Sequence, residues 1–180
     1  MFRVMPLFSF EGKTPRVDPS AFIAPTASIV GDVTVEANAS IWYGAVLRGD
    51  FAPIVVRRGA NIQDGAVVHA AEPLEIGAGA TIAHCVVMHG ASVGTEALVG
   101  NNATIQDGAR IGDRAMVAAA TLVPPNTVVE PGTLFRGTRG ESAGPLTPSA
   151  QFWVDTNPEA YQDLAKRHAA GVKQLDQQST

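Results

Sequence analysis

The sequence predicts an all-β fold in which a single-stranded parallel β-helix is followed by a C-terminal α-helix. Aliphatic anchors recur every six residues, with three shifts of register: Val17, Ile23, Ile29, Val35, Ile41, Leu47, Val56, Ile62, Val68, Ile76, Ile82, Met88, Val93, Val99, Ile105, Ile111, Val117, Val123, Val129 and Phe135. Four residues after most anchors stands a small residue: Ala21, Ala27, Ala39, Ala45, Ala60, Ala66, Ala80, Ala97, Ala103, Ala109, Ala115, Thr121, Thr127 and Thr133. A period of six fits neither an α-helix nor the alternation of an open sheet. It predicts a coil with a corner in every hexapeptide, where the anchor points inward and the small residue occupies the corner.

A β-sandwich is the alternative all-β fold for this chain. Sandwich strands are separated by turn signals roughly every 8 to 12 residues, and a sustained period of six does not match that spacing. The glycines and asparagines between the anchors, as in VGNNAT, supply the turns that a coil needs. The sequence therefore favours the coil.

Composition divides the chain into four segments. Residues 1–16 form a lead-in segment, and residues 17–135 form the β-helix domain. Residues 136–150 are rich in Gly, Pro and Ser and predict a linker. Residues 151–180 predict a helix that packs on the β-helix, with Asn157 and Pro158 as its N-cap and first turn. Its apolar side has helical spacing, at Tyr161, Leu164, Ala165, His168, Val172 and Leu175.

Several classes of protein are disfavoured by the chain as a whole. Cys85 is the only cysteine, so no disulfide forms within the chain, and the first residues lack the apolar block of a signal peptide. We therefore expect a cytoplasmic protein. No segment approaches the roughly 18 apolar residues of a membrane span, and the net charge of −4 argues against a nucleic-acid surface. Charged residues make up only 17% of the chain, which indicates that other subunits cover part of its surface.

The hexapeptide pattern resembles that of the hexapeptide-repeat proteins, which are left-handed parallel β-helices whose triangular coils take three repeats each. This resemblance implies the left hand. Periodicity alone does not set the hand, and ordinary parallel crossovers are right-handed. The predicted fold class is therefore a single-stranded left-handed parallel β-helix with a C-terminal α-helix.

Three of the four histidines stand between residues 67 and 90, where the register of six shifts. With three repeats per coil, His69 and His89 each follow an anchor on the same face of successive coils. Both imidazoles then point outward, about 4.8 Å apart like neighbouring strands, which suits two ligands of one metal. His84 lies on the preceding face, so a neighbouring subunit must supply it. We therefore expect a cyclic homotrimer with metal sites at its subunit interfaces.

Longer motifs carry a more specific resemblance: VLRGD at 46–50, NIQDGAVVHA at 61–70 and AHCVVMHG at 83–90. They resemble the γ-class carbonic anhydrases. The resemblance implies that His69 and His89 of one subunit and His84 of its neighbour bind Zn²⁺, with iron or cobalt as other metals that such ligands accept. It also implies an enzyme, a lyase that reversibly hydrates the small molecule CO2 to bicarbonate through metal-bound hydroxide.

The same resemblance assigns catalytic roles to Gln63, Glu72 and Tyr161. Gln63 corresponds to a residue that hydrogen-bonds the metal-bound solvent. Glu72 falls where a proton shuttle would begin, although an exposed glutamate is more often only a solvated turn residue. Tyr161 matches a tyrosine of the terminal helix that approaches the site, but the residue before it is Ala160 where the family usually has asparagine.

Arg48, Asp50 and Asp64 resemble a charged set that lies near the subunit interface. A bidentate pair between Arg48 and Asp64 of different subunits would fix the trimer and the ligand loop. Their roles are therefore architectural or catalytic. The loop after the first histidine is short, and Phe51 stands where better catalysts carry an acidic residue, so a slow or inactive anhydrase is one reading of the sequence.

Two other functions fit the same fold. A hexapeptide-repeat acyltransferase typically uses one catalytic histidine and a long loop that grips the acyl donor, whereas this chain has three histidines and short loops. A non-catalytic trimeric scaffold would keep the metal site for the stability of the trimer. Metal content and CO2 hydration separate these alternatives from the anhydrase.

Overall fold

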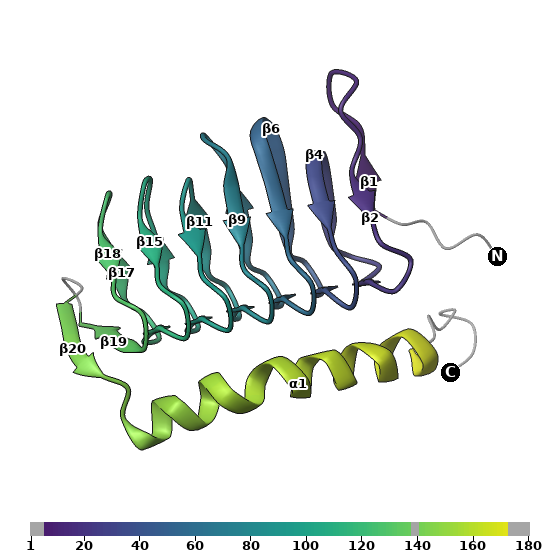
Figure 1. Ribbon diagram of the computed structural model, residues 1–180. Coiled ribbons are helices and arrows are strands. Elements are labelled where there is room, and N and C mark those ends of the chain that lie inside the picture. The colour runs from purple at the N-terminus through teal and green to yellow at the C-terminus, as the bar shows by residue number, and fades with distance from the viewer. Residues whose placement is uncertain (1–5, 138–140, 173–180) are drawn as a thin grey trace, which may run out of the picture.

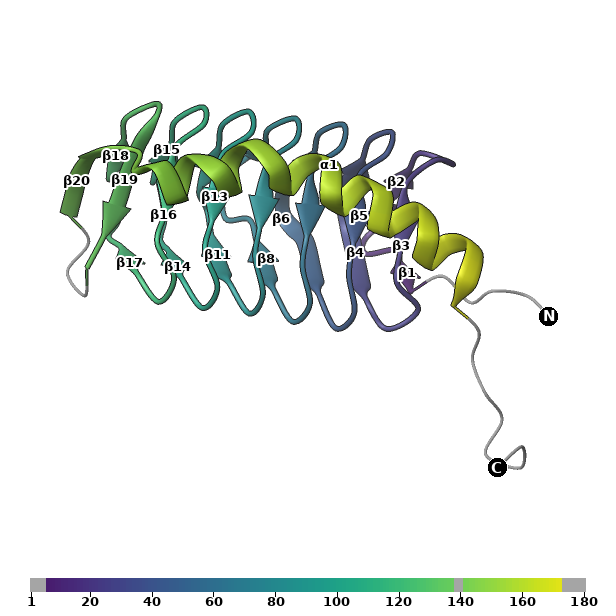
Figure 2. The same ribbon diagram turned by 90° about the horizontal axis from the view of Figure 1, so that it is seen from below.

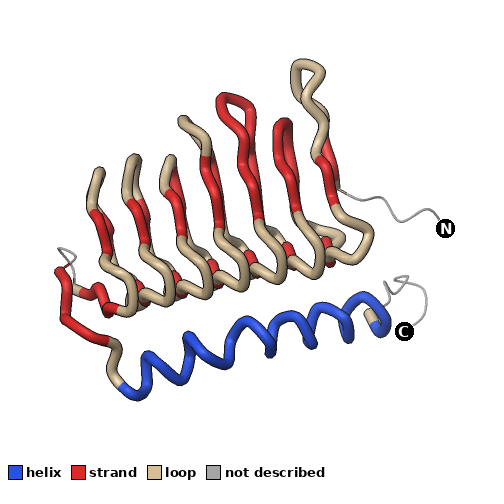
Figure 3. Tube along the Cα trace, viewed as in Figure 1, coloured by secondary structure: helices blue, strands red, loops and turns tan. Residues whose placement is uncertain are grey.

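The computed structural model describes residues 6–137 and 141–172. It is a three-sided β-helix with one long α-helix, α1 (Pro148–Gly171), lying along it (Figures 1 and 2). Short strands alternate with turns in every coil (Figure 3). The predicted left-handed β-helix with a C-terminal α-helix is confirmed.

The first face of the β-helix is an 8-stranded sheet that lies next to α1. Its strands are, in spatial order, β3 (Phe22–Ile23), β5 (Ser40–Ile41), β7 (Asn61–Ile62), β10 (Thr81–Ile82), β13 (Leu98–Val99), β16 (Met116–Val117), β19 (Thr133–Arg136) and β20 (Glu141–Pro145). All pairs are parallel except the last, between β19 and β20.

The other two faces belong to one 12-stranded sheet, which turns from the second face to the third within β4 (Ser28–Val35) and β6 (Val46–Val56). The second face continues through β1 (Leu7–Phe8), β8 (Val67–His69), β11 (Val87–His89), β14 (Thr104–Ile105) and β17 (Leu122–Val123). The third continues through β2 (Arg16–Val17), β9 (Leu74–Ile76), β12 (Ser92–Val93), β15 (Arg110–Ile111) and β18 (Val128–Val129). Three faces per coil match the three hexapeptides predicted for each coil.

The two columns of the sequence pattern form the core. Every anchor from Ile23 to Phe135 is buried, and equivalent anchors stack on successive rungs, as Ile62 does between Ile41 and Ile82. The alanines four residues after the anchors, from Ala27 to Ala115, are at most 1% exposed. A larger side chain at these corners would collide with the neighbouring coil, since protein interiors are close-packed.

Both ends of the β-helix differ from the predicted segments. The lead-in already contributes to the second face, because β1 pairs with β4. At the other end, the predicted linker contains β20, which pairs antiparallel with β19 and covers the last edge of the first face. An end strand of this kind protects unpaired backbone groups from pairing with other chains.

The predicted start of the terminal helix is wrong. α1 begins at Pro148, and the hydroxyl of Thr147 accepts the backbone N–H of Ala150 at 3.2 Å as its N-cap. Pro158 lies inside the helix, and Asn157 instead donates its side-chain N–H to the Thr81 hydroxyl at 3.1 Å. Contacts with the β-helix, such as that of Asn157, keep the chain helical on both sides of Pro158. The predicted apolar residue Leu175 lies outside the described residues.

An aromatic cluster fastens α1 to the first face. Trp42 is 3% exposed, and its ring meets those of Phe22, Tyr161 and His168 with centroids 4.9 to 5.4 Å apart. Nδ1 of His168 lies 3.1 Å from the hydroxyl of Tyr43. These contacts position Tyr161 above the corner that carries His84. Nowhere in the described chain is a helix both apolar and long enough to cross a membrane.

Candidate functional site

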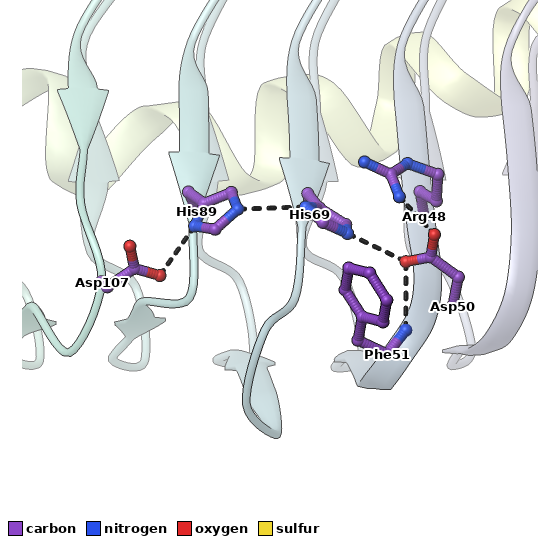
Figure 4. Close-up of polar contacts among 6 residues, drawn as sticks. All are labelled: Arg48, Asp50, Phe51, His69, His89 and Asp107. Atoms are coloured by element: carbon purple, nitrogen blue, oxygen red, sulfur yellow. Dashed lines mark hydrogen bonds and ion pairs between the residues drawn. The ribbon is translucent and has the colours of Figure 1, made fainter.

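His69 and His89 lie side by side on the second face. They end β8 and β11, which pair in parallel with His89 opposite His69, so the predicted outward column is confirmed (Figure 4). Nδ1 of His69 is 3.1 Å from Nε2 of His89, and the ring centroids are 4.9 Å apart. The strand pairing thus brings one nitrogen of each ring to the same point.

A carboxylate engages the other nitrogen of each of these rings. Nε2 of His69 is 2.8 Å from Oδ1 of Asp50, and Nδ1 of His89 is 2.7 Å from Oδ1 of Asp107 (Figure 4). A carboxylate accepts a hydrogen bond only from a nitrogen that bears a proton. Each neutral ring is therefore assigned its N–H on the side of its carboxylate partner. The lone pairs of the remaining nitrogens then face each other. A metal cation placed between the rings would bind both lone pairs.

A transition-metal ion fits this pair of nitrogens. Two bonds of about 2.0–2.1 Å to nitrogens 3.1 Å apart enclose an angle of roughly 100°, which is near the tetrahedral value. Histidine ligands whose second nitrogen is held by a carboxylate are typical of zinc sites. His69 and His89 therefore have the donor chemistry and the spacing of two ligands of one metal.

Asp50 is tied into the chain on three sides. Its carboxylate accepts hydrogen bonds from the Arg48 guanidinium, from the backbone N–H of Phe51 at 3.0 Å and from His69. Burial raises the pKa of Asp50, but the bonds from His69 and Arg48 outweigh it and lower the pKa to about 2. Asp50 is thus ionised at neutral pH and available to hold His69. Phe51 is 72% exposed, and its ring centroid lies 5.6 Å from that of His69.

His84 stands at a different corner of the β-helix. Its Nδ1 is 3.1 Å from Oδ2 of Asp64, and its Nε2 is 3.4 Å from the hydroxyl of Tyr161. The side chain of Asn101 accepts the backbone N–H of His84 at 3.3 Å. Within the described residues of one chain, no group of three or more His, Cys, Asp or Glu side chains is placed to hold a metal ion. One subunit therefore presents two histidines on one face and the third on another.

Gln63 and Tyr161 join His84 at a cavity of about 350 Å³ between α1 and the first face. Gln63 is 2% exposed, and its Nε2 donates to Oδ1 of Asn61 at 3.0 Å, which fixes the amide. Burial, and secondly the charge of Asp64, raise the pKa of Tyr161, so its hydroxyl keeps its proton at neutral pH. The structure thus brings Gln63, Tyr161, Asp64 and His84 together.

Glu72 lies apart from that cavity. It is exposed in the turn between β8 and β9, and with His89 and Asp107 it borders a depression of about 330 Å³. The expected pairing of Arg48 with Asp64 across subunits stays a prediction. Within one chain, Arg48 pairs with Asp50 and Asp64 approaches His84.

Asp107 is the site residue that the sequence reasoning missed. Its approach to His89 depends on Gly90, which has a φ of +58°, because a Cβ there would collide with the Asp107 carboxylate. An internal repeat could have revealed it. The pentapeptide IQDGA occurs at 62–66 and again at 105–109, and its aspartate contacts His84 in the first copy and His89 in the second.

The fold and the site together define a class: hexapeptide-repeat β-helices that present paired histidines on an outer face. No protein-family model matches the sequence. An alignment 99 positions long, which covers 51% of this chain, is 50% identical to gamma carbonic anhydrase 3, mitochondrial, of Arabidopsis thaliana and spans 38% of that protein. Carnitine operon protein CaiE of Escherichia coli O1:K1 is 39% identical over 169 residues, which cover 92% of this chain and 86% of that protein.

A solved structure agrees with these relatives. The crystal structure of a hexapeptide transferase family protein from Anaplasma phagocytophilum superposes with a TM-score of 0.86 at 37% identity, covering 90% of this chain and 97% of that one. The chain belongs to the γ-carbonic-anhydrase-like family of hexapeptide-repeat proteins.

Proposed function

We propose that the protein is a metal-dependent carbonic anhydrase that hydrates CO2 reversibly to bicarbonate. The observation that carries the proposal is the pair of facing nitrogens on His69 and His89, 3.1 Å apart, with a carboxylate on the far side of each ring. The Arabidopsis relative, a gamma carbonic anhydrase by name, supports the choice of reaction. A divalent cation, when bound, lowers the pKa of a coordinated water to about 7 and so supplies a nucleophile for CO2.

The third protein ligand in this proposal is His84 of a neighbouring subunit in a homotrimer. Zn²⁺ is the proposed metal, and iron or cobalt suits the same three imidazoles. In that assembly the corner with Gln63, His84 and Tyr161 faces His69 and His89 of the next subunit. The two halves of the site then complete each other at every interface.

Gln63 and Tyr161 donate hydrogen bonds to the bound ligand in this proposal, and Glu72 transfers protons. The Gln63 amide, fixed by Asn61, donates a hydrogen bond to a ligand that enters the cavity. The protonated hydroxyl of Tyr161 is a second donor on the same side. Glu72 is exposed beside His89 and Asp107, so its carboxylate takes up a proton there and releases it to solvent.

An apolar column on the second face supports the trimer. Val67, Val87 and Leu122 are 39%, 45% and 38% exposed and stand in register on the same face as the two histidines, with Thr104 between the last two. Such a patch beside a functional site is typical of an interface with another chain. It is the surface that a neighbouring subunit would cover.

Substitution Val87→Lys tests this surface. The variant should shift from trimer to monomer at micromolar concentration, since burying an unpaired ammonium at an interface costs several kcal/mol. Light scattering coupled to size-exclusion chromatography measures the mass directly. Val128→Lys, on the third face and 58% exposed, is the matched control and should stay trimeric. A trimeric Val87→Lys protein would place the interface elsewhere.

Metal analysis of freshly purified protein, combined with a stopped-flow CO2 hydration assay, tests the proposed function. We expect one metal per subunit and measurable hydration in the native protein, and loss of both in His84→Ala. An active His84→Ala trimer without metal would contradict the anhydrase. Stoichiometric metal without hydration would instead favour a scaffold that uses the site for assembly.

Asp107→Asn tests the carboxylate behind His89. Removing this charged acceptor should weaken zinc affinity about 10- to 100-fold, because the ring loses the partner that fixes its tautomer and orientation. Competition with a chromogenic chelator measures the change. Asp113→Asn is the matched control, since Asp113 accepts the backbone N–H of Thr95 and contacts none of the three site histidines. Equal zinc affinities of the two variants would show that Asp107 does not contribute to zinc binding.

Group transfer, of which acyl transfer is the tested case, is the second candidate function, because the Anaplasma structure is named a hexapeptide transferase family protein and superposes with a TM-score of 0.86. An acetyl-coenzyme A hydrolysis and transfer assay separates it from hydration. An acyltransferase would turn over the acyl donor after its metal has been removed by a chelator. An anhydrase would lose its hydration activity under the same treatment.

A further inference from the structure

The cavity under α1 is much larger than the hydration of CO2 requires. Its volume of about 350 Å³ compares with about 30 Å³ for one molecule of liquid water, so there is room for about twelve waters or for an organic molecule of similar size. CO2 has three atoms. Within one chain, the remaining space can hold a larger ligand.

The walls of the cavity are divided into a polar and an apolar side. Polar side chains come from the corners of the coils and from α1: Gln63, His84, Asn101, Asn157 and Tyr161. Apolar side chains come from β13, β16, their neighbouring corners and α1: Ala83, Leu98, Met116, Ala119 and Trp153. Cavities with an apolar wall and a few convergent polar groups are typical of small-molecule sites.

Without a bound metal, the polar side of the cavity suits a carbonyl group better than an anion. The amide oxygen of Asn101 accepts the His84 backbone N–H, so its NH2 group is directed to other partners. The Gln63 amide and the Tyr161 hydroxyl are further donors to a carbonyl oxygen. Among the eleven lining residues, all of them described, there is no Lys or Arg to pair with a carboxylate or a phosphate.

We propose that this cavity binds an uncharged carbonyl compound with a short aliphatic chain. The carbonyl oxygen would lie among the donors beside His84, and the chain would lie against Leu98, Met116 and Trp153. This inference rests on the proposed function in placing His84 at the metal, and it names the class of substrate that the same site accepts beyond CO2. The cavity itself is formed by a single chain.

A series of primary amides, from propanamide to hexanamide, tests the proposal. Binding is followed by the fluorescence of Trp153, which is 51% exposed, whereas Trp42 is 3% exposed in the aromatic cluster. A Trp153→Phe variant verifies the source of the signal. Titrations are made on the full protein, both as purified and after its metal has been removed by a chelator. We expect the affinity to rise about fourfold with each added methylene, the factor that corresponds to burying one CH₂ group.

Two variants and one control distinguish a defined binding site from non-specific binding. Ala119→Phe fills the cavity from an exposed turn and should weaken hexanamide binding at least tenfold. Its matched control, Ala170→Phe, is exposed near the far end of α1 and should bind as the native protein does. Met116→Ala, which removes part of the apolar wall, should weaken hexanamide but leave propanamide unchanged.

The outcomes distinguish this inference from the proposed function. Affinity that does not depend on chain length, or that is the same in Ala119→Phe and Ala170→Phe, overturns the cavity proposal even when CO2 is hydrated. Hexanoate that binds the metal-free protein more tightly than hexanamide overturns the choice of an uncharged ligand. Chain-length-dependent binding without CO2 hydration supports the cavity and contradicts only the anhydrase.

Discussion

Subunits that carry His84→Ala and subunits that carry His89→Ala should restore, when mixed, metal sites that neither variant has alone. The His84→Ala subunit keeps the His69 and His89 pair, and the His89→Ala subunit keeps the corner with His84. In trimers assembled at random from equal amounts, about a quarter of the interfaces combine the two intact halves. Metal bound per subunit and the hydration rate should therefore recover to about a quarter of the native values.

The matched control uses the other pair of histidines. Mixing His69→Ala with His89→Ala subunits should restore nothing, because both ligands must come from one face of one subunit. The metal content is measured on trimers purified through two different affinity tags after co-expression. This step removes the homotrimers, so the expected recovery in the purified sample of the first mixture is about a third, one intact interface in each mixed trimer. Recovery in the control, or its absence in the first mixture, would contradict a site shared in this way between subunits.

The sequence predicts most of this fold because the chain repeats itself. One hexapeptide needs an inward anchor and a small corner residue, and the same requirement recurs on every coil. With so many repeats, the sequence is compatible only with a period of six. The stacking of His69 and His89 follows from counting repeats, because parallel strands in register place equivalent residues one rung apart. The requirements of a single hexapeptide, repeated along the chain, are therefore sufficient to predict the β-helix and the column of His69 and His89.

The parts that could not be predicted depend on single long-range contacts. The pair Asn157 and Pro158 has the form of a helix start, but Thr147 and Pro148 have the same form ten residues earlier. A proline within a helix costs about 3 kcal/mol, and the burial of Val154 together with the hydrogen bond from Asn157 to Thr81 offsets this cost. Asp107 likewise contacts His89 only because Gly90 leaves room for its carboxylate. Each feature is decided by one neighbour and leaves no periodic signal.

Ile82→Ala should lower the free energy of unfolding by about 3–4 kcal/mol, in the middle of the range for such substitutions. Ile82 is fully buried between Ile62 and Val99 on adjacent rungs, and its carbonyl accepts the backbone N–H of Gln63 at 2.8 Å. Because ladder hydrogen bonds hold the backbone on both sides, the coil cannot collapse into the cavity that the substitution leaves. Val128→Ala, at an exposed position on the third face, is the control and should change stability by less than about 1 kcal/mol. Urea unfolding at one fixed protein concentration measures both variants, and equal losses would show that the core does not depend on the stacked anchors.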